Sequence, residues 1–171
     1  MLDQIEIRNL GGNQELSDFL ELLLMTPGFA AVTSLGIVRD AEKDVAGAFR
    51  SVTDALRRAC LSVPDRALVK AIGYPTVSVF ILPNCASSGM LETLCLQSIG
   101  NDPAIRCIDE YFKCLETEGV ELPANLTKAR THAFLASRPR PDLLVGQAAH
   151  AGYWRWEHEA FDPLKEFLNA L

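Results

Sequence analysis

The fold is decided by one apolar stretch that ends in two carboxylates, Leu35-Gly36-Ile37-Val38-Arg39-Asp40-Ala41-Glu42. Its first four residues are the end of an apolar run with β-branched side chains over residues 29–38, which predicts a buried strand. Residues 44–60 follow with apolar side chains at helical spacing. The next apolar run, Thr76–Leu82, predicts another strand, closed by Pro83 and Asn84. A strand, a helix and a second strand in this order indicate parallel strands joined by a crossover helix.

The segments on either side extend this α/β pattern. Ile5–Leu10 alternates apolar and polar residues before Gly11-Gly12, which predicts a strand and a turn. Residues 15–25 predict an amphipathic helix, and from Gly89 onward the pattern is helical, with helices expected at 90–99, 102–118 and 126–137. A last helix or pair of helices follows the break at residues 138–141. We therefore expect an α/β fold with a mostly parallel sheet, flanking helices and a helical C-terminal portion. The chain is expected to form a single domain over residues 1–171, with a sheet core in 1–100 and a helical extension in 101–171.

Composition excludes several classes of protein. The 171 residues are 49% hydrophobic and 22% charged, values that exclude a disordered chain, a collagen-like repeat or a coiled coil. No apolar stretch approaches the roughly 20 residues that a membrane span needs, so we expect no membrane association. The net charge of −6 excludes a strongly basic nucleic-acid footprint, although an acidic metal cluster would still permit a nucleic-acid enzyme. Five cysteines without a CxxC pair, and no secretory signal, predict reduced thiols and a cytoplasmic location.

Three carboxylates at predicted junctions between strand and helix are the candidate metal ligands. Asp40 and Glu42 are two residues apart on an extended segment, so their side chains point to the same side. Glu92 lies in the first turn of the helix after the strand Thr76–Leu82. Hard oxygen ligands of this kind suit Mg²⁺ or Mn²⁺. The alternative is structural: Asp40 would cap the following helix, and Glu42 and Glu92 would be acidic residues favoured at helix N-termini.

Two further groups of side chains suggest contact with an anion or a base. Lys128 and Arg130 open a predicted helix, where the helix dipole disfavours cations, so an anionic partner would account for them. The alternative is a basic face in contact with water. Tyr153, Trp154 and Trp156 could stack on nucleic-acid bases, or could belong to the core or to a dimer contact.

In their order along the chain, these features resemble a Toprim-like domain. The resemblance is to overcoming-lysogenization-defect (OLD) nucleases and to a related uncharacterised family of bacterial and archaeal proteins. It rests on five segments, in family order: Ile5–Gly12, Leu35–Glu42, Phe80–Pro83, Gly89–Glu92 and Lys128–Arg130. The tail is similar to the uncharacterised family in particular, from Gly152-Tyr153-Trp154 through Phe161–Leu168.

The resemblance implies a metal-dependent phosphoryl-transfer enzyme, nuclease-like, with Mg²⁺ or Mn²⁺ as cofactor. By position, Asp40 and Glu42 match the paired acidic metal ligands, Glu92 matches the later acidic residue with a metal and catalytic role, and Lys128 matches the catalytic lysine that faces phosphate. The partner implied is a nucleic acid.

One departure from the family pattern opens a second interpretation. The family begins with a strand that ends in a Glu-Gly pair, whereas Met1 stands directly before the segment that resembles the second strand. The alternatives are a catalytically degenerate Toprim-like module that binds a partner or forms a homodimer, and an α/β protein that holds a small molecule in the same crevice at the strand ends.

Overall fold

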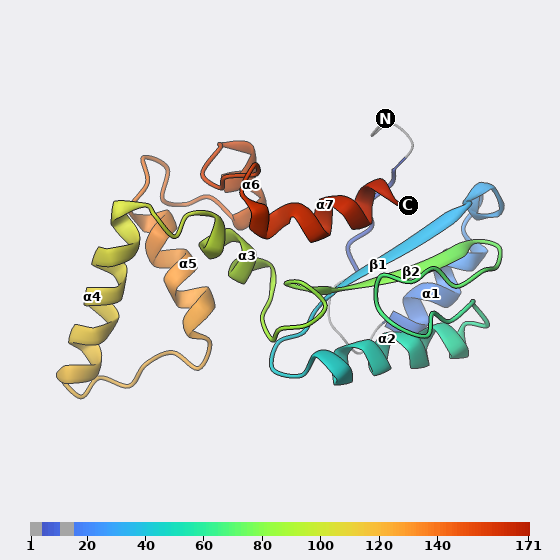
Figure 1. Ribbon diagram of the computed structural model, residues 1–171, viewed down its shortest axis with the longest axis horizontal. Helices are drawn as coiled ribbons and strands as arrows, with labels where there is room; N and C mark the ends of the chain where they lie inside the picture. The colour runs from blue at the N-terminus through green and yellow to red at the C-terminus, as the bar shows by residue number, and fades with distance from the viewer. Residues whose placement is uncertain (1–4, 11–15) are drawn as a thin grey trace.

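The structure is a computed structural model that describes residues 5–10 and 16–171 (Figure 1). Two strands, β1 (Ser34–Asp40) and β2 (Thr76–Leu82), form the sheet in this part of the chain. The α-helices are α1 (Leu16–Met25), α2 (Val45–Arg58), α3 (Leu91–Ser98), α4 (Pro103–Thr117), α5 (Leu126–Ala136), α6 (Val145–His150) and α7 (Asp162–Asn169). Short 3₁₀ turns occupy η3 (Phe29–Ala31) and η4 (Glu159–Phe161).

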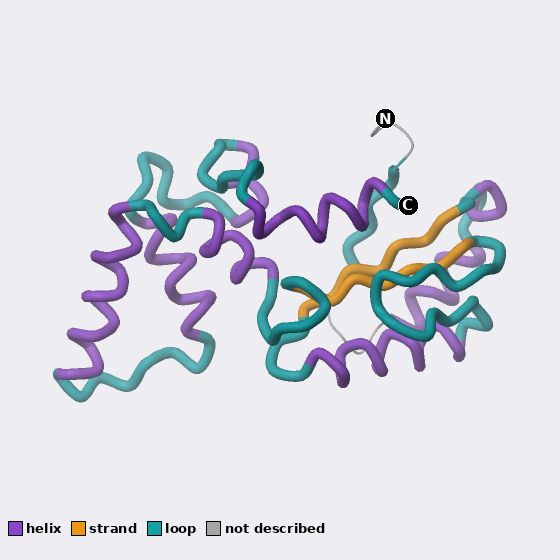
Figure 2. The backbone as a smooth tube through the Cα atoms, viewed as in Figure 1, coloured by secondary structure: helices purple, strands orange, loops and turns teal. Residues whose placement is uncertain are grey.

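The sheet consists of two parallel strands joined by α2. β1 and β2 pair in register from Ser34 opposite Thr76 to Asp40 opposite Leu82. The other edge of β2 is bordered by the long loop after α2 (Figure 2). There the N–H of Ala71 donates to the carbonyl of Val77 over 2.8 Å. This arrangement confirms the α/β class and the parallel pairing that the sequence predicted.

Helices cover both faces of the sheet. On one face, α1 and α2 bury Leu20, Val52 and Leu56 against alternate residues of the strands. On the other face lies α7, whose Phe167 ring is centred 5.3 Å from that of Phe80. Gly36 permits this close approach, because a Cβ atom at that position would lie 2.8 Å from both δ-methyl groups of Leu171. Because Gly36 has no side chain, Phe167 of α7 and Leu171 after it can pack directly against β1.

The helices from α3 onward share one hydrophobic core, which reaches the sheet through Phe80 and Leu82. Trp154 lies in this core at 2% exposure, stacked on Phe134 with ring centroids 5.2 Å apart. Its indole N–H donates to the carbonyl of Val145 over 3.0 Å. Trp154 is therefore a core residue, which answers one of the alternatives left by the sequence. Local signals set the ends of these helices: Asp102 caps α4, with Pro103 at its first position.

The structure corrects the sequence predictions in the N-terminal region. Residues 5–10 form no strand, and Ile7 is 88% exposed. The expected strand at 29–38 begins only at Ser34, because a 3₁₀ turn occupies Phe29–Ala31 after Gly28 at φ 92°. The predicted turn at Gly11-Gly12 and the predicted helix start at residue 15 lie outside the described residues. Across residues 5–10 and 16–171, no helix is long and apolar enough to cross a membrane.

Candidate functional site

The loops that follow the two strands are held together by backbone hydrogen bonds. The N–H of Ala41 donates to the carbonyl of Leu82 over 3.0 Å. Glu42 and Gly89 exchange two N–H···O bonds of 2.8 Å each, as a single antiparallel bridge. Glu42 takes φ 52° to form it. These two hydrogen bonds join the loop after β1 to the loop after β2, and we call them the Glu42–Gly89 bridge.

Gly89 fits this position for two reasons. Its φ of 143° is rarely adopted by residues that carry a side chain. A Cβ atom there would also lie 2.7 Å from Thr93 Oγ1 and 3.1 Å from Pro83 Cδ. The same Thr93 hydroxyl accepts a hydrogen bond from the N–H of Met90 over 3.0 Å, at the start of α3. Gly89 therefore couples the bridge to the beginning of α3.

Asp40 reaches α3 directly. Its Oδ1 accepts a hydrogen bond from the N–H of Leu91, the first residue of that helix, over 3.0 Å. The structural alternative in which Asp40 caps the helix following β1 is wrong, because Asp44 caps α2 by accepting from the N–H of Gly47. Asp40 instead satisfies a free N–H of a helix 51 residues away. Glu92, the next residue of α3, lies in the same first turn.

α5 brings Lys128 to the same place. Asn125 caps this helix by accepting from the N–H of Lys128 over 3.0 Å. The side-chain amide of Asn125 also donates to Met90 Sδ over 3.6 Å, which joins the starts of α5 and α3. Sequence reasoning did not identify the contact between Asn125 and Met90. The available signal was local: Asn125 is a favoured cap residue before the predicted helix, but nothing in the sequence says which helix it faces.

The electrostatics of Asp40 show that the four predicted site residues share one environment. Burial raises the pKa of Asp40 above its ordinary value, and the nearby charges of Glu92 and Glu42 raise it further. The hydrogen bond from Leu91 and the charge of Lys128 act in the opposite direction. Glu92 also contributes, after burial, to a pKa of about 12 for the Cys95 thiol. The structure therefore brings Asp40 within electrostatic reach of Glu42, Glu92 and Lys128.

The acidic side chains are not neutralised by ion pairs. Asp40, Glu42 and Glu92 form no salt bridge within the described part of the chain. Within residues 5–10 and 16–171, no group of three His, Cys, Asp or Glu side chains is arranged to enclose a metal ion. Mg²⁺ usually keeps several waters and is held by one or two carboxylates. The described residues therefore do not form a closed protein cage, and a cation here would have to be held by one or two carboxylates and water.

Other candidate residues lie elsewhere or have other roles. Arg130 is paired with Asp109 of α4, which accounts for a cation in the first turns of α5. The phenol oxygen of Tyr153 accepts from the N–H of Arg140 over 3.3 Å. Trp156 is 41% exposed and packs against Phe161. None of these side chains contributes to the environment of Asp40 described above.

Comparison with known proteins gives one result. A family model described as "Protein of unknown function (DUF3226)" matches residues 2–171. No curated protein and no solved structure matches the chain. The match covers nearly the whole sequence, so the residues of the fold and of the site described above all lie within the matched region.

Proposed function

The chain belongs to the DUF3226 family, whose function is unknown, and we propose that it is a metal-dependent phosphoryl-transfer enzyme of the Toprim type, with nuclease-like chemistry. The observation that carries the proposal is the environment of Asp40. This carboxylate is partly buried beside the charges of Glu42 and Glu92, and Lys128 is the cation that acts on it. Asp40 accepts one hydrogen bond, from Leu91, and has no ion-pair partner in the described chain.

Such an arrangement is costly for the folded chain and favourable for a cation. Like charges in a partly buried place disfavour each other's ionisation. A divalent cation between them would relieve this repulsion and favour the ionised form of Asp40. Asp40 and Glu92 are the proposed direct ligands, because Asp40 at the end of β1 accepts a hydrogen bond from the first residue of α3, and Glu92 is the next residue of that helix. Glu42 is proposed to add negative charge near the cation, since no three acidic side chains of the described residues are placed to hold one ion.

Each side chain then has a distinct part in the proposed chemistry. When bound, a divalent cation supplies charge neutralisation on the phosphate and a water of lowered pKa. The hydrogen bond from Leu91 fixes the Asp40 carboxylate, so that its position does not depend on the ligand. Lys128 offers an ammonium to the phosphate oxygens, where negative charge develops in phosphoryl transfer. The Glu42–Gly89 bridge keeps the two loops at a constant separation.

A nucleic acid is the proposed substrate. Phosphodiesters carry the charge that Lys128 and a bound cation would both attract. The net charge of −6 makes wide electrostatic attraction of nucleic acid unfavourable, so recognition would be local to this site.

The test is hydrolysis of single- and double-stranded DNA and RNA by the full chain with Mg²⁺ or Mn²⁺. We expect cleavage that needs the metal and that falls by about 100-fold or more in Asp40→Asn and Lys128→Met. Asp54→Asn is the matched control, because Asp54 is an exposed carboxylate of α2 paired with Arg57. Absence of cleavage of every substrate with either metal would contradict the proposal, as would full activity in Asp40→Asn.

A second function, a binding or dimerisation module, is favoured by one separate observation. The edge of β1 that faces away from β2 pairs with no strand among residues 5–10 and 16–171. Val38 of β1 is 43% exposed. An unpaired strand edge is a template for another strand. Sedimentation of the full chain distinguishes the cases, since a monomer at all concentrations tested would contradict dimerisation through this edge.

A further inference from the structure

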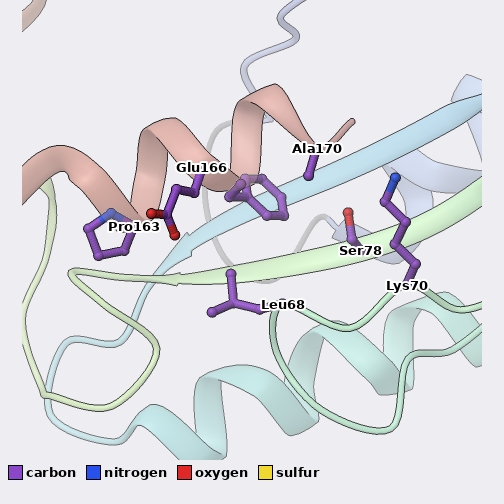
Figure 3. Close-up of a pocket in the computed structure, with 7 residues that line it drawn as sticks. Leu68, Lys70, Ser78, Pro163, Glu166 and Ala170 are labelled. Carbon is purple, nitrogen blue, oxygen red and sulfur yellow. The ribbon is translucent and has the colours of Figure 1, made fainter.

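A surface cavity open to solvent, separate from the acidic site, lies between α7, β2 and the loop before β2 (Figure 3). Its volume is about 240 Å³. Four apolar side chains line it: Leu68, Pro163, Phe167 and Ala170. Sites for drug-sized ligands are usually about 300–1,000 Å³, so this cavity suits a smaller molecule. None of its lining residues belongs to the group around Asp40.

The Ser78 hydroxyl is the first sign that the cavity takes a polar ligand. Ser78 lies in β2, is 4% exposed and lines the cavity. Figure 3 shows its oxygen directed from the strand toward the C-terminal end of α7. In the described part of the chain this hydroxyl has no hydrogen-bond partner. The oxygen is not one of the fully enclosed side-chain atoms that lack a partner, so it is open to the cavity, where water or a ligand atom can bind it.

Two unpaired charges lie toward opposite ends of the same cavity. Lys70 is placed beside Ser78, and Glu166 lies on α7 near Pro163 (Figure 3). Both residues are exposed, and neither forms a salt bridge within residues 5–10 and 16–171. Leu68 and Phe167 supply the apolar surface of the cavity.

We propose that this cavity binds a small dipolar molecule, with an anionic group on Lys70 and Ser78, a protonated amine on Glu166 and an aliphatic segment against Phe167. The ammonium of Lys70 and the hydroxyl of Ser78 both donate to an anion. The carboxylate of Glu166 accepts from an ammonium. A linear ω-amino acid has this sequence of groups. The proposal is independent of metal binding and of phosphoryl transfer at Asp40.

The test is NMR titration of the ¹⁵N-labelled full chain with three probes that differ only in their ends: 6-aminohexanoate, hexanoate and hexylamine. We expect 6-aminohexanoate to shift the amide signals of Lys70, Ser78 and Glu166, and to bind more tightly than either one-ended probe. Lys70→Met should weaken 6-aminohexanoate and hexanoate by about tenfold each, since each loses one charged hydrogen bond. Glu166→Gln should weaken 6-aminohexanoate and hexylamine similarly, and leave hexanoate unchanged.

Two controls separate binding from general changes in the protein. Lys113→Met removes a lysine from α4, outside the cavity, and should leave all three affinities unchanged. Ser78→Ala keeps the buried position filled and should weaken the two carboxylate probes alone. The proposal is overturned if no probe shifts the cavity signals, if hexanoate binds as well as 6-aminohexanoate, or if the Lys70 and Glu166 variants bind like the unsubstituted chain.

Discussion

Replacing Gly89 by alanine tests whether the Glu42–Gly89 bridge and the start of α3 require glycine at this position. An alanine would have to adopt a φ of 143°, a strain of about 1–3 kcal/mol. Its Cβ would lie 2.7 Å from Thr93 Oγ1, so the threonine must move. That movement breaks the 3.0 Å hydrogen bond from Met90 to Thr93, which costs about 1 kcal/mol more. We therefore expect a loss of about 2–4 kcal/mol in the free energy of unfolding.

Urea and thermal denaturation followed by circular dichroism measure this loss. For a chain of this size it corresponds to a fall in Tm of roughly 4–16 °C. Gly119→Ala is the matched control, because Gly119 has φ 73° but nothing within 4 Å of an added Cβ. That control isolates backbone strain and should cost about 1–2 kcal/mol. The reasoning is refuted if Gly89→Ala costs no more than Gly119→Ala.

Three further outcomes follow from burial and charge. The pKa of Asp40 is raised in the folded chain, so folding favours the protonated carboxyl group. The contribution of Asp40 to the free energy of unfolding is therefore fully present below pH 3.8, and it is lost as the pH rises through the raised pKa. Asp40→Asn should therefore raise Tm at neutral pH, and the gain should vanish below pH 3.8, as a pH series of thermal melts would reveal. Trp154→Ala should cost about 3–5 kcal/mol in urea denaturation, and the more exposed Trp156→Ala clearly less. Iodoacetamide labelling followed by mass spectrometry should leave Cys95 unmodified in the folded chain, since it is buried with a pKa of about 12. The thiols expected to react are the exposed ones, Cys60, Cys107 and Cys114.

The sequence predicts those parts of the fold whose signals are local. The strand Thr76–Leu82 is confirmed with its predicted ends, because a continuous apolar run suits a strand buried on both faces. Pro103 and Gly119 likewise mark the two ends of α4. The segment Ile5–Leu10 has the alternation of a half-buried strand but forms none. Alternation specifies which side chains would share a face, but it does not supply a partner strand.

The candidate site could be predicted only in part for the same reason. Parallel strands with a crossover helix place Asp40 and Glu92 at one edge of the sheet, and this much follows from the order of elements. The hydrogen bond between Asp40 and Leu91 depends on where α3 lies relative to β1. That position is set by the packing of α3 in the hydrophobic core, which the local sequence does not specify. The approach of Lys128 depends on the contact between Asn125 and Met90, for which the sequence carries no signal.

Titration calorimetry of the full chain with Mg²⁺ tests the central claim most directly. The claim is that the environment of Asp40 holds a divalent cation. We expect binding at about millimolar concentrations or below, lost in Asp40→Asn and kept in Asp54→Asn. Circular dichroism would confirm that both variants keep the fold, so that a loss of binding is assigned to the site. No binding by the unsubstituted chain, or equal binding by Asp40→Asn, would contradict the account and leave Asp40 as a residue that caps α3.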